Sequence, residues 1–223
     1  MLARSLLKLP NDLDVNKING LMWERETNTQ QLKSVIQFDN HSFSVSDMKV
    51  FQATAYHERC IDREKLIQDG RKYKIVLQGE KYVTKANCHF TKGLGLVGTL
   101  DHRKFVLEIL RQGYRSIIPP VEYSIDTAKL ANDHSNQWIH NFSGRKGRVD
   151  SGVVYGDGVE RDTIFGPELG SADVGTIGWV TDFFNDFTKV RVSPKGSVII
   201  MGEIDMDSFF SFILNEIMPY VDH

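Results

Sequence analysis

The stretch Thr84–Tyr114, TKANCHFTKGLGLVGTLDHRKFVLEILRQGY, contains the pattern G-x-G-x-x-G at Gly93–Gly98, between a strand-like and a helix-like segment. In dinucleotide-binding loops this pattern opens directly into a helix, and a βαβ unit follows. Here Thr99 and Leu100 separate the last glycine from the helix-like segment, and two prolines at 119–120 interrupt any βαβ unit. The pattern therefore predicts a hairpin turn and a strand end, and no cofactor.

A second copy of this stretch lies 104 residues further on, at Thr188–Met218 (TKVRVSPKGSVIIMGEIDMDSFFSFILNEIM). The two copies agree at seven of 31 positions, where average composition gives about two by chance. The matching pairs are Thr84/Thr188, Lys85/Lys189, Gly98/Gly202, Asp101/Asp205, Phe105/Phe209, Ile109/Ile213 and Leu110/Leu214. Such self-similarity indicates an internal repeat.

Both copies predict the same order of elements: a strand, a Lys-Gly turn, an apolar strand ending in Gly, and an amphipathic helix. Asp101 and Asp205 precede the helical segments and suit helix N-caps. Six apolar residues recur at helical spacing, so we expect them to be buried against a sheet. They are Phe105, Ile109, Leu110, Phe209, Ile213 and Leu214.

Composition excludes several classes of protein. The 223 residues are 41% hydrophobic and 25% charged, as in an ordinary globular domain, and the formal net charge is -2. A chain this acidic lacks the overall basic charge of non-specific nucleic-acid binders, so any polyanion site must be local. No apolar run approaches the ~20 residues of a membrane span. The distant Cys60 and Cys88 fit a reducing, intracellular setting, in nucleus or cytoplasm.

No catalytic set can be assembled from the sequence. The seven histidines include His134 and His140, but none is spaced from another ligand as in a helical metal site. Nucleophile elbows, Walker loops and kinase motifs do not occur. We therefore expect neither an enzyme nor a metal site.

The duplicated phrase, with FTKGLGLVG in one copy and VSPKGSVIIMG in the other, resembles the TATA-box-binding protein family. The ending FILNEIMPYV and the crossing segment RQGYRSIIPPVEYSID are similar as well. The resemblance implies an α+β fold of two pseudo-twofold repeats, 1–118 and 119–223. These would form a saddle, with an antiparallel sheet and helices on the convex face. The divergence is typical of relatives in large DNA viruses and mobile elements.

The same resemblance implies a transcription initiation factor that binds AT-rich duplex DNA in the minor groove, with transcription factors or RNA polymerase subunits as partners and no membrane. Phe90 falls where the family has a wedge phenylalanine, whereas the second copy offers Val192 or Ser193. Asn19 stands where the family has a first-strand asparagine, and Asp126 departs from it. Five cations would meet phosphates, or else lie on a solvated hairpin surface: Lys85, Lys92, Lys189, Arg191 and Lys195.

The remaining segments allow a coarse organisation. We expect a strand near 18–24, a helix near 30–36, and two strands at 72–79 and 82–90. The glycine-rich segment 143–175 predicts an extended loop or irregular strands. Its densest basic cluster, GRKGR, offers Arg145, Lys146 and Arg148 as flexible phosphate contacts, or as a solvated loop tip.

Two other functions stay open. The fold could serve as a protein-interaction scaffold that no longer binds DNA, which the acidic net charge and the lost family residues favour. A substrate-recognition domain of a small enzyme is the weakest reading, because no acid–base or nucleophile set is present.

Overall fold

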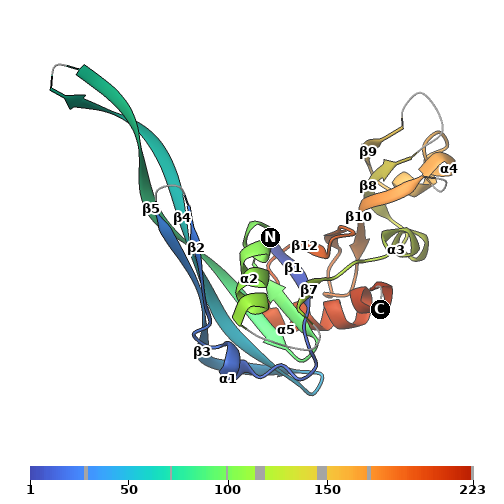
Figure 1. Ribbon diagram of the computed structural model, residues 1–223. Coiled ribbons are helices and arrows are strands. Elements are labelled where there is room, and N and C mark those ends of the chain that lie inside the picture. Colours follow the sequence, from blue (N-terminus) through green and yellow to red (C-terminus); the bar gives the residue numbers. More distant parts are fainter. Residues whose placement is uncertain are drawn as a thin grey trace. The chain divides into compact units, whose positions relative to one another are not determined.

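The structure is a computed structural model that describes residues 1–27, 30–70, 72–98, 100–113, 119–144, 150–169 and 172–221. The fold is α+β and is dominated by antiparallel strands with few helices (Figure 1). Two compact units make up the chain. The first unit comprises Leu9–Ser42 and Val50–Pro120, and the second unit comprises Met1–Lys8, Phe43–Lys49 and Val121–His223.

The first unit is built on a sheet in the order β2-β3-β4-β5-β6. Its strands are β2 (Met22–Glu26), β3 (Gln31–Val45), β4 (Met48–Asp69), β5 (Lys72–Thr91) and β6 (Leu94–Val97). The helices are the short α1 (Val15–Ile18) and the long α2 (Leu100–Gly113). One face of α2 is buried, including Val106 and Ile109, and its Phe105 ring stacks on His57 of β4.

The glycine pattern forms a hairpin, as the sequence predicts. Thr91 and Leu94 pair across a two-residue turn in which Gly93 has φ 77°, a conformation that favours glycine. β6 then runs antiparallel to β5, and Gly95 pairs with Phe90 in the middle of the ladder. No helix begins at Gly95, so the loop does not have the geometry of a dinucleotide site.

The helix expected at 30–36 is wrong, because this segment begins β3. Its buried residues are Leu32, Ser34 and Ile36, which alternate with more exposed neighbours. That period of two is the signature of a half-buried strand. The two strands expected at 72–79 and 82–90 are a single strand, β5, with no turn at Gly79.

The second unit contains a sheet in the order β1-β12-β11-β10-β8-β9, with β7 paired to β1. Its strands are β1 (Leu2–Lys8), β7 (Val121–Glu122), β8 (Gln137–Ser143), β9 (Gly152–Tyr155), β10 (Asp173–Thr181), β11 (Thr188–Val192) and β12 (Ser197–Met201). Its helical segments are α3 (Thr127–Asp133), η1 (Val159–Arg161), α4 (Gly166–Leu169), α5 (Met206–Phe212), η2 (Ile213–Ile217) and η3 (Met218–Tyr220). In the described part of the glycine-rich segment 143–175, the structure has β9, η1 and α4. The extended loop is therefore wrong there, and of the irregular strands expected as the alternative, β9 is present.

Five of the six apolar helix residues expected in the core are buried, and Leu214 is the exception. Leu214 is only half-buried, whereas Phe210, Phe212 and Ile217 join Phe209 and Ile213 inside. The cause is the π-helix η2, which follows α5 without a break. A π turn inserts one extra residue and rotates the following side chains out of phase with the α-helical stripe.

The helix caps follow the sequence in one copy only. Asp205 caps α5, since its carboxylate accepts the N–H of Ser208 at 2.8 Å. The cap expected at Asp101 is wrong, because α2 begins at Leu100 and includes Asp101.

A second internal similarity lies upstream of the hairpins. Asp14 caps α1 and Asp126 caps α3, each accepting a backbone N–H two or three residues on. Both helices bury an apolar residue four positions after the cap, namely Ile18 and Leu130. The phrases DVNKI and DTAKL thus extend the repeat beyond the stretch that the sequence comparison found. Among the described residues, no helix combines the length and apolar character that crossing a bilayer requires.

Candidate nucleic-acid interface

The sheet of the second unit has one covered and one open face. On the covered face, Val190 and Val192 of β11 are fully buried, and the neighbouring Trp179 stacks on Phe212 of α5. Side chains alternate along a strand, so Lys189 and Arg191 point to the opposite face. Lys189 is exposed and Arg191 half-buried there. Two of the cations expected from the sequence are therefore brought together on one open surface.

An indole ring forms a platform beside these cations. The Lys189 ammonium lies 5.3 Å from the centre of the Trp138 ring, and the Trp138 Nε1–H donates to the carbonyl oxygen of Val190 at 3.2 Å. Gly178 makes room for the indole. A Cβ at Gly178 would lie 2.9 Å from Trp138 Cε2 and 2.6 Å from Ile139 Cγ2. Because Gly178 of β10 has no side chain, it leaves a gap that the Trp138 ring of the neighbouring strand β8 fills.

Apolar side chains on β12 extend the same surface. Ile199 pairs with Arg191, and the exposed Met201 pairs with Lys189. Directly opposed residues of an antiparallel pair lie on one side of the sheet. The open face therefore mixes two cations, an indole and accessible aliphatic groups, the combination expected of a sheet that contacts a groove floor and its phosphates.

The first unit carries a similar pair. Lys85 of β5 is exposed, and its ammonium lies 5.5 Å from the centre of the Tyr56 ring on β4. Tyr56 and Lys85 are direct cross-strand partners, and both point away from the side where His57 stacks on α2. A cation held over an aromatic ring is attracted by the ring's negative face, which keeps the side chain extended over the sheet.

Lys85 and Lys189, which the sequence repeat aligns, do not occupy equivalent positions in their hairpins. Lys189 pairs with Met201 inside its hairpin. Lys85 has no partner on β6, which ends at Val97 opposite Cys88. The hairpins therefore differ in register, and what the units share is a lysine over a ring on the side away from the helix.

Lys92 and Lys195 occupy the two hairpin turns. Each is followed by a glycine with positive φ, 77° at Gly93 and 70° at Gly196. The Gly196 carbonyl accepts the N–H of Leu6, and the Gly93 carbonyl accepts that of Leu9. Both turns are thus fixed from within their own units. Lys92 and Lys195 are both exposed at their turns.

The wedge role expected of Phe90 is wrong for this structure. Phe90 is 0% exposed, lies on the α2 side of β5 with Ala86 and Cys88, and contacts Phe38 with 5.6 Å between ring centres. In the second unit Val192 is likewise fully buried on the helix side. A ring that fills the core cannot enter a base step without leaving the core.

The strand position expected of Asn19 is also wrong. Asn19 is the C-cap of α1, and its side-chain oxygen accepts the N–H of Phe38 at 3.1 Å. Its expected counterpart, Asp126, is a helix N-cap. Both residues have local structural roles. The basic cluster of Arg145, Lys146 and Arg148 lies outside the described residues.

Trp138 and Tyr56 are the residues that sequence reasoning missed. The alternation in QWIHNF and in the long run before His57 was available as a strand signal. Which ring lies under which lysine depends on register across two strands, and the sequence does not reveal that register.

His57 is buried at the junction of β3, β4 and α2. Arg25 can only donate, so its Nη2 donates to His57 Nε2 at 3.4 Å, and His57 Nδ1–H donates to Ser34 Oγ at 2.6 Å. Burial lowers the pKa of His57 to about 4, and the positive charges of Arg25 and Arg59 contribute to the lowering. The imidazole is therefore neutral at pH 7 and acts as a structural connector.

A cavity of ≈ 410 Å³ in the second unit is lined by His134, Gln137 and His140 among others. The side-chain oxygen of Gln137 accepts the Nδ1–H of His140 at 3.0 Å, and burial lowers the pKa of both histidines. Within the described part of the chain, no group of three His, Cys, Asp or Glu side chains is placed to hold a metal ion.

The chain was compared with protein-family models, with curated proteins and with solved structures, and nothing matches in any of the three comparisons.

Proposed function

We propose that this chain is a DNA-binding transcription initiation factor similar to the TATA-box-binding protein family, which contacts the minor groove of duplex DNA through the open faces of its two sheets. The observation that carries the proposal is the lysine held over an aromatic ring in each unit, Lys85 over Tyr56 and Lys189 over Trp138, on the side away from the helix. Arg191 and the exposed Met201 add a further phosphate contact and an aliphatic surface.

The chemistry of the open faces suits this role. Sheets that bind the minor groove combine cations for phosphates with apolar groups for the groove floor, and they prefer deformable AT-rich sites. Because Phe90 is buried, the proposal includes no wedge from this residue, and the expected DNA bend is shallow. Affinity then comes mainly from phosphate contacts and should depend strongly on salt.

Replacing Lys85 and Lys189 together with alanine should lower the slope of log K against log salt by about 1.8, or about 0.9 for each lost phosphate contact. Fluorescence anisotropy of AT-rich and GC-rich duplexes over a salt series measures this slope. The matched control is Lys17→Ala with Lys104→Ala, two exposed lysines off these open faces. An equal change in control and test variants would mean that net charge alone, and not the sheet faces, governs binding.

A protein-interaction scaffold is the second candidate, and an exposed edge strand favours it. β9 is the last strand of its sheet, and Val153 and Tyr155 on one of its faces are exposed. An unpaired edge of this kind can accept a strand from a partner such as a transcription factor or an RNA polymerase subunit. If the wild-type chain shifts no duplex at low salt, direct DNA binding is excluded and the scaffold function takes its place.

A further inference from the structure

The β4–β5 hairpin of the first unit extends as a two-stranded arm. β4 has 22 residues and β3 has 15, and the two-residue turn Ser46–Asp47 joins them. At most 15 residues of β4 can therefore pair with β3. The rest, together with its partner strand, forms the segment Arg63–Gln78, which we call the arm. Figure 1 shows β4 and β5 continuing beyond β2 and β3.

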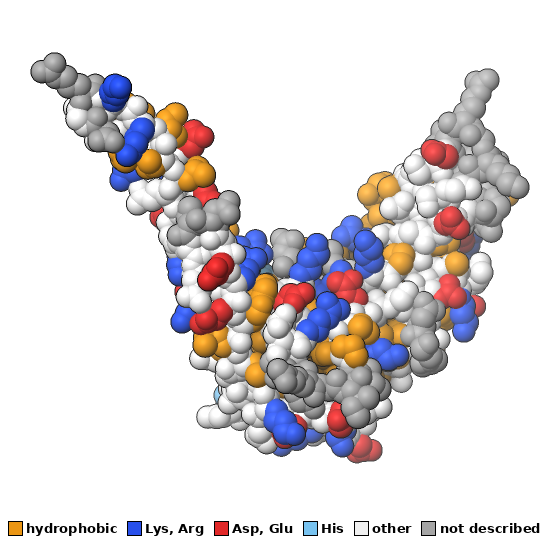
Figure 2. Space-filling model, in the orientation of Figure 1, with side chains coloured by type: hydrophobic (Ala, Val, Ile, Leu, Met, Phe, Trp, Pro, Cys, Tyr) orange, Lys and Arg blue, Asp and Glu red, His pale blue; other side chains and the backbone are white. Residues whose placement is uncertain are grey.

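One side of the arm is mainly apolar, although it includes Glu64 and Gln68, and the other side, called basic here, carries the cations together with Ile67 and Val76. Leu66 pairs with Ile75 on the apolar side, where these two residues are 63% and 64% exposed and Tyr73 and Leu77 are also exposed. Side-chain alternation places four cations on the other side. They are Arg63, Lys65, Lys72 and Lys74. Figure 2 shows Lys and Arg side chains near the end of the arm beside exposed hydrophobic ones.

The arm is basic, whereas the chain as a whole is slightly acidic. Residues 63–78 contain five Lys or Arg and two acidic residues, a formal charge of +3, whereas the whole chain has -2. Arg63 forms an ion pair with Glu80 at 3.5 Å, and both side chains are more than 60% exposed, so the pair is weak. A local basic surface on an acidic protein indicates an anionic partner.

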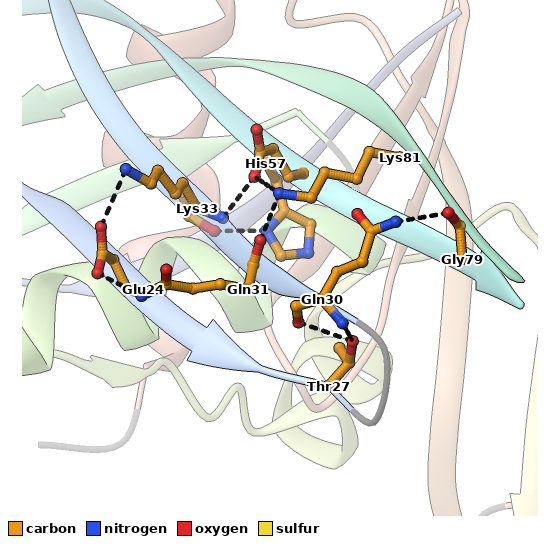
Figure 3. Close-up of polar contacts among 10 residues, drawn as sticks. Glu24, Thr27, Gln30, Gln31, Lys33, His57, Gly79 and Lys81 are labelled. Atoms are coloured by element: carbon orange, nitrogen blue, oxygen red, sulfur yellow. Dashed lines mark hydrogen bonds and ion pairs between the residues drawn. The ribbon is translucent and has the colours of Figure 1, made fainter.

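The root of the arm is fixed by the Gln30 side chain of the turn before β3 and by Lys81 and Glu58, whose side chains contact the β3 backbone (Figure 3). Gln30 donates from its amide to the carbonyl of Gly79, and Lys81 donates to the carbonyl of Gln31. Glu58 accepts the N–H of Lys33 at 2.8 Å and lies 3.6 Å from the Lys81 ammonium. The direction in which the arm leaves its own sheet is therefore set by the fold, which limits the entropy lost on binding.

We infer that the arm is a second contact to duplex DNA and that its basic side binds the phosphates of a groove. The inference rests on the proposed function and adds a separate site to it. A two-stranded ribbon fits the major groove. An isolated two-stranded hairpin is only marginally stable in water, so the part of the ribbon beyond its fixed root is expected to gain order from a partner.

Two other partners fit the arm less well. In a second copy of the chain, the basic sides repel each other, and four apolar residues fall short of the ~800 Å² per partner that a stable interface needs. A lipid surface is flat, and the arm can present only its apolar or its basic side to it. Duplex DNA is a polyanion and therefore complements the basic side of the arm.

The test is the triple variant Lys65→Gln, Lys72→Gln and Lys74→Gln, with Lys17→Gln, Lys49→Gln and Lys104→Gln as a control of equal charge. All six lysines are exposed. The arm variant should lower the salt slope of duplex binding by up to about 2.7. About seven residues of β-ribbon at ~3.4 Å each span about seven base pairs, so a hydroxyl-radical footprint should shorten by about that length at one side. Thermal unfolding checks that each variant remains folded.

The outcomes separate the two proposals. If the arm variant and its control bind alike, the arm inference is overturned and the sheet faces alone explain binding. If the arm variant loses slope while Lys85→Ala with Lys189→Ala does not, the arm contact holds and the proposed sheet interface fails. If the wild-type chain binds no duplex, or if the arm lysines matter only for phosphatidylserine vesicles, the arm is not a DNA contact.

Discussion

Replacing Phe90 with alanine should lower the free energy of unfolding by about 3–5 kcal/mol, as expected for a fully buried phenylalanine. The ring is 0% exposed, and removing it would leave a cavity between Phe38, Cys88 and the strand β6. The result can be measured by urea denaturation, where the midpoint should fall while the slope stays unchanged.

Two further variants make the Phe90 prediction specific. Phe90→Leu keeps most of the apolar volume and should destabilise the protein less than Phe90→Ala. Phe187→Ala removes a ring that is 84% exposed, and its effect should stay within about 0.5 kcal/mol. An alanine variant as stable as wild type, with reduced DNA bending, would restore Phe90 as an exposed wedge.

Acid should destabilise the first unit through His57. The pKa of His57 is about 4 in the folded protein, against 6.5 for an unperturbed histidine in an unfolded chain, so the unfolded state binds the proton first. The stabilisation from neutral His57 is thus complete above pH 6.5 and is lost as the pH falls towards 4. A shift of this size corresponds to roughly 3 kcal/mol.

A difference experiment isolates this histidine from the others. Unfolding free energies of wild type and His57→Gln are measured from about pH 7.5 to about pH 4, the range over which the folded and unfolded states differ in protonation. The variant keeps a polar group beside Ser34 but cannot titrate. Its free energy of unfolding should therefore fall by roughly 3 kcal/mol less than that of wild type over this pH range. Direct titration of the imidazole by NMR should give a pKa well below 6.5. Two parallel stability curves would mean that His57 takes up its proton at an ordinary pKa.

The sequence predicted the hairpins correctly because their signals are local. A Lys-Gly turn, a β-branched strand and an apolar helical face each depend on a few neighbouring residues, and Gly93, Gly196 and Ile213 lie where those signals place them. The missed elements depend on distant partners. Leu32, Ser34 and Ile36 fit a strand only when one side of β3 is buried, and Leu214 left the core through a π turn that no residue type announces.

The candidate site was predictable only in part. Lys189 and Arg191 could be placed on one side of a strand from the alternation of VRV, and the structure has them there. The rings beneath the lysines could not be foreseen, since Trp138 reaches Lys189 across β10 and through the gap at Gly178. Phe90 shows the opposite failure, because matching it to a family position said nothing about which side of β5 faces the core.

The pairing of β1 with β12 also constrains how the protein is made. Leu2 lies opposite Ile200, so β1 is synthesised well before the strand with which it pairs. The first unit can form while the rest is still being translated, since its segments end at Pro120. Until β12 has been synthesised, Leu6 and Leu7 of β1, which are buried in the folded protein, remain exposed to solvent. At about 5–20 residues per second this delay lasts roughly ten seconds or more, long enough for a chaperone to engage the nascent strand.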